Sequence, residues 1–407
     1  MKKPLTLVLV YYFIQGFVHN LGHPVTPTFV NQLGIEPRMF GFFFSFMSLG
    51  LVVGAPLWGI LGDARHKKPF IVGGLLIYSL GQLLFGLSSN PWWMTGWRFL
   101  AGFGVSAAVT LFLAHIVGLT EKEERTKYLS ISAALLALGS TVGYQVGGIL
   151  GETIIREVFL WQAFLNTVYA GLILFTFKET VQTKVSQSSV FSQFKAMSHL
   201  SPGLLLFLFS LALATMSMTI LSKYLDVYII DLGYSTRVLG TFVMVTGLVG
   251  LATNFFLVPF LTRFKKDVII MRYAQVFSAV LVFLVFRSNE IFVALYTLYM
   301  LYMVSRSIFQ PLEQNHISLS ADASTYGRIM GVRQMFFAIG MVLGPLMAGF
   351  IYEINPVLVF DVSAVIFLLA FVLMTLSQKS FAKEALRNGQ QVTPPSRLET
   401  PEYQASP

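Results

Sequence analysis

The segment that decides how this chain folds reads Gly59-Ile60-Leu61-Gly62-Asp63-Ala64-Arg65-His66-Lys67-Lys68. It separates two apolar stretches, residues 39–61 and 69–88. Each stretch has about the 20 apolar residues that an α-helix needs to cross roughly 30 Å of hydrocarbon. The sequence therefore predicts two membrane-spanning helices joined by a short basic loop.

Similar apolar stretches recur along nearly the whole chain of 407 residues. Hydrophobic residues make up 55% of the sequence and charged residues only 12%, and the mean hydropathy is +0.70. A water-soluble core cannot bury so much apolar surface, so the bilayer must be the solvent. The net charge of +9 lies in short loops, which argues against nucleic acid as a partner. The absence of cysteine excludes disulfides and thiolate metal sites.

Charged and turn residues divide the chain into twelve predicted spans in two sets. The first set covers residues 5–30, 39–61, 69–88, 92–118, 128–151 and 157–177. The second covers residues 203–229, 238–261, 267–286, 290–319, 329–352 and 356–377. We expect an all-α membrane protein with a six-helix bundle at 1–177, a cytoplasmic loop at 178–201 and a second bundle at 202–377. The polar tail at 378–407 is expected to be disordered.

The basic residues predict the orientation. Most of the 28 Lys and Arg residues fall on the side of the two termini and the central loop. The opposite side has Arg38, Arg156, Arg237 and Arg287. Because positive residues near span ends stay in the cytoplasm, both termini are expected there, in a bacterial cytoplasmic (inner) membrane.

The two sets of spans also repeat one another. An offset of 199 places Gly34, Arg38 and Gly41 on Gly233, Arg237 and Gly240. An offset of 201 places Gly139, Gly143 and Glu152 on Gly340, Gly344 and Glu353. This is an internal duplication, and duplicated halves of a transporter place the substrate site near the bilayer midplane, at their interface.

The segment at 59–68 resembles the loop signature G-x-L-a-D-r-x-G-r-k of the major facilitator superfamily. The matching residues are Gly59, Leu61, Asp63, Lys67 and Lys68, while Ala64 and His66 depart from it. The resemblance implies that Asp63, with Gly59, Arg65, Lys67 and Lys68, forms a latch that holds the outward-facing state. Alternatively, Arg65, Lys67 and Lys68 only follow the positive-inside rule.

Two further segments strengthen this resemblance. Arg98-Phe99-Leu100-Ala101-Gly102-Phe103-Gly104 is similar to the superfamily signature R-x-x-q-G-x-g, which implies a role for Arg98 in proton coupling. Near the outer end of its span, Arg98 could instead snorkel to the interface. Gly139, Gly143, Gly147 and Gly148 resemble a signature of drug–proton antiporters, with Tyr144 where proline is expected. The repeated segment has Gly340, Gly344, Pro345 and Gly349, and both sets of glycines predict close helix packing.

Ionisable residues within spans are the candidates for proton coupling. Glu313 is expected to carry the proton, with Arg306 and Arg98 beside it. Alternatively, Glu313 is an ordinary carboxylate at a helix end, close to cytoplasmic water. Asp226 is expected to pair with Lys223 at i and i+3, and His19 and His23 to share one helix face. Arg333 and Asp361 are expected at the membrane interfaces.

These features predict a proton-coupled secondary transporter that exports hydrophobic or amphipathic compounds by alternating access. The alternative is a lipid or glycolipid flippase of the same fold. Uptake of small solutes and a membrane enzyme fit less well, because few polar residues mark the spans and no catalytic cluster occurs. No ATP-binding loop is present, so we expect the proton gradient to supply the energy, with no cofactor and no metal. The expected partners are substrate, protons and membrane lipid, and the expected state is a monomer.

Overall fold

The computed structural model describes residues 3–64, 66–179, 200–320 and 326–387, and nearly all of them are helical. In the first half, these residues form α1 (Lys3–Asn20), α2 (Thr26–Gln32), α3 (Arg38–Ala64), α4 (Lys67–Leu87), α5 (Pro91–Leu119), α6 (Lys122–Leu150) and α7 (Ile155–Thr176). Within the described ranges, eleven helical segments of the chain are long and apolar enough to cross a membrane. The first predicted span is the exception.

The second half contains α9 (Pro202–Asp231), α10 (Thr236–Ala252), α12 (Asp267–Val285), α15 (Tyr326–Ile354) and α16 (Pro356–Arg387). One span continues from α10 through a π-helical turn, η1 (Thr253–Leu257), into α11 (Val258–Thr262). Another consists of α13 (Ile291–Tyr296) and α14 (Leu298–Ser320). α16 continues ten residues beyond the predicted end at 377. Residues 388–407 of the predicted tail and 180–199 of the predicted loop lie outside the described residues.

A continuous first span at 5–30 was the wrong prediction. α1 ends at Asn20, and a turn separates it from the short α2. Pro24 explains the break, since proline has no backbone N–H and its ring clashes with the preceding helical turn. The Thr26 hydroxyl donates to the Gly22 carbonyl across this turn, at 2.6 Å.

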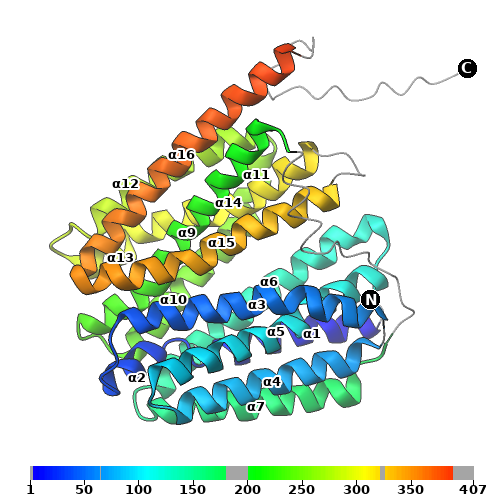
Figure 1. Cartoon of the computed structure of the whole chain (residues 1–407), viewed down its shortest axis with the longest axis vertical. Coiled ribbons are helices and arrows are strands. Elements are labelled where there is room, and N and C mark those ends of the chain that lie inside the picture. The colour runs from blue at the N-terminus through cyan, green and yellow to red at the C-terminus, as the bar shows by residue number, and fades with distance from the viewer. Residues whose placement is uncertain (1–2, 65, 180–199, 321–325, 388–407) are drawn as a thin grey trace, which may run out of the picture.

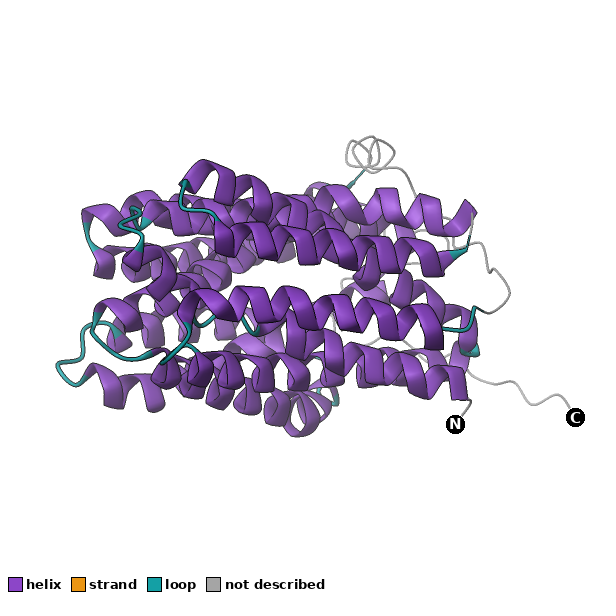
Figure 2. Ribbon diagram, turned by 90° about the horizontal axis from the view of Figure 1, so that it is seen from below, coloured by secondary structure: helices purple, strands orange, loops and turns teal. Residues whose placement is uncertain are grey.

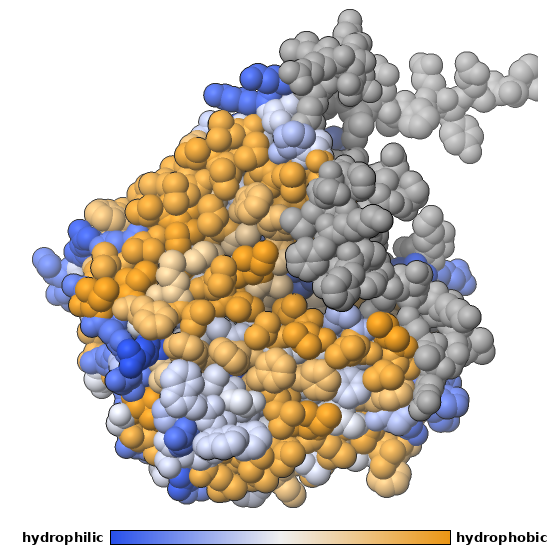
Figure 3. All heavy atoms as spheres, in the orientation of Figure 1, coloured by the Kyte–Doolittle hydropathy of each residue, from blue (hydrophilic) through white to orange (hydrophobic). Residues whose placement is uncertain are grey.

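The helices form two bundles, α1–α7 and α9–α16, that lie against each other (Figure 1). The helices run largely along one direction (Figure 2). α1 begins and α16 ends at the same end of the molecule, which we call the terminal end. Apolar residues cover most of the visible surface, and hydrophilic residues gather toward its edges (Figure 3). This is the surface of a protein solvated by lipid.

The predicted glycine packing is confirmed. A Cβ atom added to Gly139, Gly143 or Gly147 would lie 2.0–2.3 Å from a backbone oxygen of Phe13, Phe17 or Leu21. In the second half, Gly340 and Gly344 approach Ala212 and Met216 of α9 in the same way. Ala212 and Met216 follow Phe13 and Phe17 by 199 residues, the offset of the repeat. The duplication therefore extends from the glycines to the residues that they contact.

The turns also repeat. Gly34 follows α2 with φ +65°, and Gly233 follows α9 with φ +84°. In each turn the next residue's N–H donates to a carbonyl five positions back, from Ile35 to Val30 and from Tyr234 to Ile229. This left-handed helix end favours glycine because glycine lacks a Cβ atom.

Gly147 offers a test of the packing. We expect Gly147→Ala to lower the melting temperature of the purified protein by several degrees, because the new Cβ would lie 2.0 Å from the Leu21 carbonyl oxygen. The matched control is Gly171→Ala in α7, where nothing lies within 4 Å of the added atom. Without a clash, alanine is about 1 kcal/mol better than glycine in a helix interior. Equal melting temperatures for the two variants would contradict the close contact.

Candidate functional site at the interface of the halves

Two repeat-related ion pairs join the halves at the end opposite the terminal end. Arg38 of α3 lies 3.7 Å from Glu353 of α15. Arg237 of α10 lies 3.7 Å from Glu152, the second residue after the end of α6. The duplication relates Arg38 to Arg237 and Glu152 to Glu353, so one interaction occurs twice, each time between halves. We call this set of four residues the paired gate.

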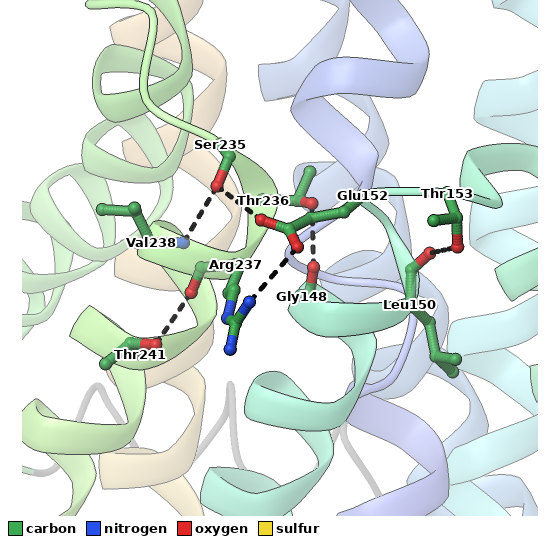
Figure 4. A network of polar contacts seen from close by, with 9 residues as sticks. All are labelled: Gly148, Leu150, Glu152, Thr153, Ser235, Thr236, Arg237, Val238 and Thr241. Atoms are coloured by element: carbon green, nitrogen blue, oxygen red, sulfur yellow. Dashed lines mark hydrogen bonds and ion pairs between the residues drawn. The ribbon is translucent and has the colours of Figure 1, made fainter.

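The paired gate surrounds a closer backbone contact. Thr236 donates to the Gly148 carbonyl at 2.8 Å, and Ser235 donates to Glu152 at 3.0 Å (Figure 4). A Cβ atom on Gly148 would lie 2.5 Å from the Thr236 carbonyl oxygen. Partly exposed ion pairs contribute only about 0–1 kcal/mol each. The glycine contact therefore brings the halves together, and the ion pairs add orientation and a modest stabilisation.

A second contact between the halves packs α3 against α15, and Phe40 of α3 also meets α9. A Cβ atom on Gly41 would lie 2.2 Å from the Pro345 carbonyl oxygen. Ser45 donates to the Val342 carbonyl at 2.6 Å. Phe40 packs on Tyr224 with ring centroids 5.9 Å apart. By contrast, two polar contacts described at the terminal end stay within one half: the Lys68 N–H donates to Glu179, and Asn315 donates to Asp267.

Beneath the paired gate, charged residues of both halves gather around Phe44 of α3. The Lys223 ammonium lies 4.2 Å from the centre of the Phe44 ring, and the Arg98 guanidinium lies 6.0 Å from it. His23 stacks on the same ring at 5.4 Å. Arg306 of α14 is close enough to interact electrostatically with Lys223. We call Arg98, Lys223, Asp226 and Arg306 the interface cluster.

Asp226 is the acidic member of the interface cluster, and its partner belongs to the other half. The Tyr144 hydroxyl of α6 lies 3.3 Å from Asp226 Oδ2. Tyr144 occupies the position where the antiporter signature has proline, so this departure supplies a phenol at the interface. The predicted direct ion pair between Lys223 and Asp226 is not formed, because Lys223 turns toward Phe44 and Asp226 toward Tyr144. Lys223 still attracts Asp226 through space.

Arg98 does not snorkel. It is only 2% exposed and donates to Thr26 at 3.1 Å and to Gln82 at 3.4 Å. Its guanidinium lies 3.9 Å from the centre of the Phe85 ring. An arginine within a span costs about 2.5–3.5 kcal/mol on insertion scales, so these partners are needed to hold it there. The snorkelling alternative is therefore excluded, whereas a role of Arg98 in proton coupling stays a prediction.

The two histidines do not share a helix face. His19 lies in α1 and bonds Asn166 of α7 at 3.0 Å, whereas His23 lies in the turn after α1. The expectation of a common face is wrong because α1 ends between them. Gln162 donates to the His19 carbonyl and to Tyr78, so His19 belongs to a network within the first half. His23 stacks between Phe44 and Tyr144, beside the interface cluster.

Glu313 lies outside the interface cluster and has a partner of its own. Arg333 Nη2 donates to Glu313 Oε2 at 3.0 Å, and Arg333 Nε also bonds this carboxylate. Both side chains are about 95% buried. Arg333 lies four residues inside the end of the span Ile329–Ile354, so its expected place at the membrane interface stays a prediction, but its side chain is buried in the protein. Asp361, also expected at the interface, keeps partial exposure and bonds Arg287 at 2.6 Å.

The loop signature is only partly described. The side chain of Asp63 and the whole of Arg65 lie outside the described residues, so the latch stays a prediction. Lys67 is buried, and the Lys68 N–H donates to Glu179 Oε1 at 2.6 Å. His66, which replaces the second glycine of the signature, also contacts Glu179. Glu179 thus ties the loop to the end of α7, a contact that sequence spacing gave no means to predict.

Two pseudo-symmetric membrane bundles that hold a charged cluster between them define the polytopic transporter class. The chain belongs to the Major Facilitator Superfamily, whose sequence profile matches residues 8–302 and 251–399.

Several individual relatives are named for drug resistance. Multidrug resistance protein 1 of Bacillus subtilis is 26% identical over 86% of this chain and 90% of that protein. The class H tetracycline resistance protein of Pasteurella multocida is 22% identical over 87% of this chain and 90% of that protein.

The fold has solved counterparts. A bacterial homolog of the human lysosomal transporter Spinster, in an inward-facing and unoccupied conformation, superposes with a TM-score of 0.77. That comparison covers 94% of this chain and 99% of the other at 13% sequence identity, so it concerns the fold alone.

The paired gate can be tested with a single cysteine, because the chain has none of its own. In a Ser45→Cys background, we expect the gate variant Glu152→Gln/Glu353→Gln, reconstituted in lipid nanodiscs that expose both faces, to react faster with a maleimide. Ser45 is 1% exposed in the closed arrangement. Two ion pairs of up to about 1 kcal/mol each limit the acceleration to roughly thirtyfold.

The matched control is Asp361→Asn, which removes an ion pair within the second half, Arg287–Asp361. This control should leave the labelling rate of Ser45→Cys unchanged. Equal rates for the gate variant and its Ser45→Cys parent would contradict the assignment of the paired gate.

Proposed function

We propose that this protein is a secondary transporter that exports hydrophobic or amphipathic compounds in exchange for protons. The observation that carries the proposal is the interface cluster, where ionisable groups of both halves meet beneath a closed end. A site between halves can change its access when the halves rock against each other. The names of the drug-resistance relatives support the choice of substrates and the direction of transport.

The orientation is part of the same proposal. With both termini in the cytoplasm of a bacterial inner membrane, the paired gate faces outward, and the structure corresponds to an inward-facing state. Opening to the outside then requires separation of Arg38 from Glu353 and of Arg237 from Glu152. The modest strength of such exposed pairs suits a gate that must open in every cycle.

Asp226 replaces Glu313 as the proposed proton carrier. Glu313 is held by Arg333 of the same half, and the hydrogen bonds described for these two side chains all stay within that half. Removing one member of a buried ion pair costs about 3–5 kcal/mol, which argues for a structural role. Asp226 instead contacts Tyr144 across the interface and feels the charges of Lys223 and Arg306. A proton on Asp226 would therefore change the charge balance of the site between the halves.

The proposed cycle follows from that charge balance. A protonated Asp226 can donate to a neighbouring oxygen, whereas the ionised carboxylate accepts from Tyr144 and attracts Lys223. Release of the Asp226 proton toward the cytoplasm would strengthen the attraction of this carboxylate to Lys223 and Arg306 of the same half. Proton uptake from outside would weaken it. Substrate and proton then alternate at one site, which is the requirement for exchange.

Asp226→Asn tests the carrier. In proteoliposomes, we expect this variant to lose dye transport driven by an imposed pH gradient, down to the level without a gradient. The amide keeps the shape of the side chain but cannot release a proton. Dye binding and dye-for-dye exchange should persist. Uphill transport by Asp226→Asn with an unchanged pH optimum would show that another group carries the proton.

Glu313→Gln is the matched comparison, because it neutralises an equally buried carboxylate in the same half. We expect it to lower thermal stability while transport per folded molecule still responds to the gradient. Loss of gradient response in Glu313→Gln, with Asp226→Asn normal, would return the role to Glu313.

A further inference from the structure

The interface cluster contains more positive than negative charge. Arg98, Lys223 and Arg306 contribute three cations, and Asp226 contributes at most one anion. The site is therefore positive whether Asp226 is ionised or protonated. Resting on the proposed function, we propose that it binds the anionic group, a carboxylate or phosphate, of an amphipathic substrate.

Lys223 has no oxygen partner of its own. Among the contacts described for this residue, its ammonium faces the Phe44 ring at 4.2 Å and makes no hydrogen bond. It also lies too far from Asp226 for a direct ion pair, although both stand on α9. Lys223 keeps some exposed surface. An ammonium in this position has three donors available for a ligand.

Arg306 also has no described oxygen partner. Its one described hydrogen bond runs from Nη1 to the sulfur of Met303, at 3.8 Å, and sulfur is a weak acceptor. Nearby, the Tyr302 hydroxyl is fully buried and has no hydrogen-bond partner. The Nε of Arg98 is buried without a partner too. Donors without acceptors therefore occur in both halves, on α5, α9 and α14.

Three other arginines of the described residues do have acidic partners. Arg333 pairs with Glu313, Arg287 with Asp361, and Arg237 with Glu152. Charges in a membrane span are costly unless they are paired or face water. Unpaired cations that gather between the halves indicate that the missing partner comes from outside the chain.

Aromatic residues beside the interface cluster can also contact the apolar part of an anionic substrate. Phe44 lies between His23, Lys223 and Arg98, and its ring offers an apolar face within reach of the cations. Tyr299 and Tyr302 add buried aromatic surface beside Arg306. A compound with one anionic group and a bulky apolar part matches both features, whereas a cationic amphiphile would face three like charges.

The test measures binding without any pH gradient, so it does not depend on transport or on its direction. The probes are dansyl-undecanoic acid and two analogues in which trimethylammonium or hydroxyl replaces the carboxylate. Each is titrated by fluorescence into the full-length protein in phosphatidylcholine nanodiscs, with empty nanodiscs subtracted. We expect the carboxylate to bind at least about tenfold more tightly than either analogue.

Variants locate the effect. Lys223→Gln and Arg306→Gln should each weaken carboxylate binding by about tenfold and leave binding of the alcohol unchanged. The matched controls, Lys266→Gln and Arg263→Gln, remove the same charges from exposed positions beside α12 and α11, and should change neither. If a variant fails to fold, Lys223→Arg keeps the charge and should retain the preference for the carboxylate.

A second arm separates two sources of the anion. Nanodiscs that contain phosphatidylglycerol should displace the carboxylate probe if a lipid headgroup fills the site, and should not displace it if the ligand is a small amphipathic acid. Either result supports anion binding. Equal or weaker binding of the carboxylate, or binding of none of the probes, would overturn it. In that case the protein could still export a dye when a pH gradient is imposed. Loss of anion binding would therefore leave the proposed function intact, and the two proposals can fail separately.

Discussion

The close backbone contact at one end of the interface is the constraint on which the rest of this structure depends. Gly148 meets Thr236 and Gly41 meets Pro345 at distances that leave no room for a side chain. Because the internal duplication relates α6 to α15 and α3 to α10, the same contact forms twice and closes both sides of the interface together. The paired gate is placed around this contact. Charged residues beneath it are then shielded from that end of the molecule.

The cost of charge in a membrane explains the distribution of the ionisable residues. Within the second half, Glu313 and Arg333 neutralise each other and hold α14 against α15. Within the first half, Arg98 is held by Thr26, Gln82 and the Phe85 ring. Lys223, Asp226 and Arg306 have weaker or cross-interface partners, so their environment changes most if the halves move. Bonds within one half can persist when the halves move, whereas the contact of Asp226 with Tyr144 joins the two halves and must change.

Sequence reasoning predicted the features that depend on length and periodicity. Apolar stretches gave the spans, the offset of the repeat gave two halves, and glycines four apart gave the packing faces of α6 and α15. It failed where partners come from distant helices. Spacing within α14 shows that Arg306 and Glu313 share a face, but it cannot show that Arg333 lies opposite Glu313. The break after Asn20 was missed because hydropathy continues through it, although Pro24 was the available signal. Tyr144 was noticed as a departure from a signature, yet its partner, Asp226, is set by the contact between the halves.

Alternating access about this interface is the central claim, and distances between spin labels test it most directly. One pair, at Gln32 and Ile354, spans the halves at the gated end, and another, at Glu124 and Arg263, spans them at the terminal end; all four positions are exposed. The measurement is double electron–electron resonance in lipid nanodiscs, at several pH values and with substrate. The account predicts opposite changes, in which the Gln32–Ile354 distance lengthens as the Glu124–Arg263 distance shortens. Distances that stay fixed under all conditions, or that lengthen and shorten together, would contradict it.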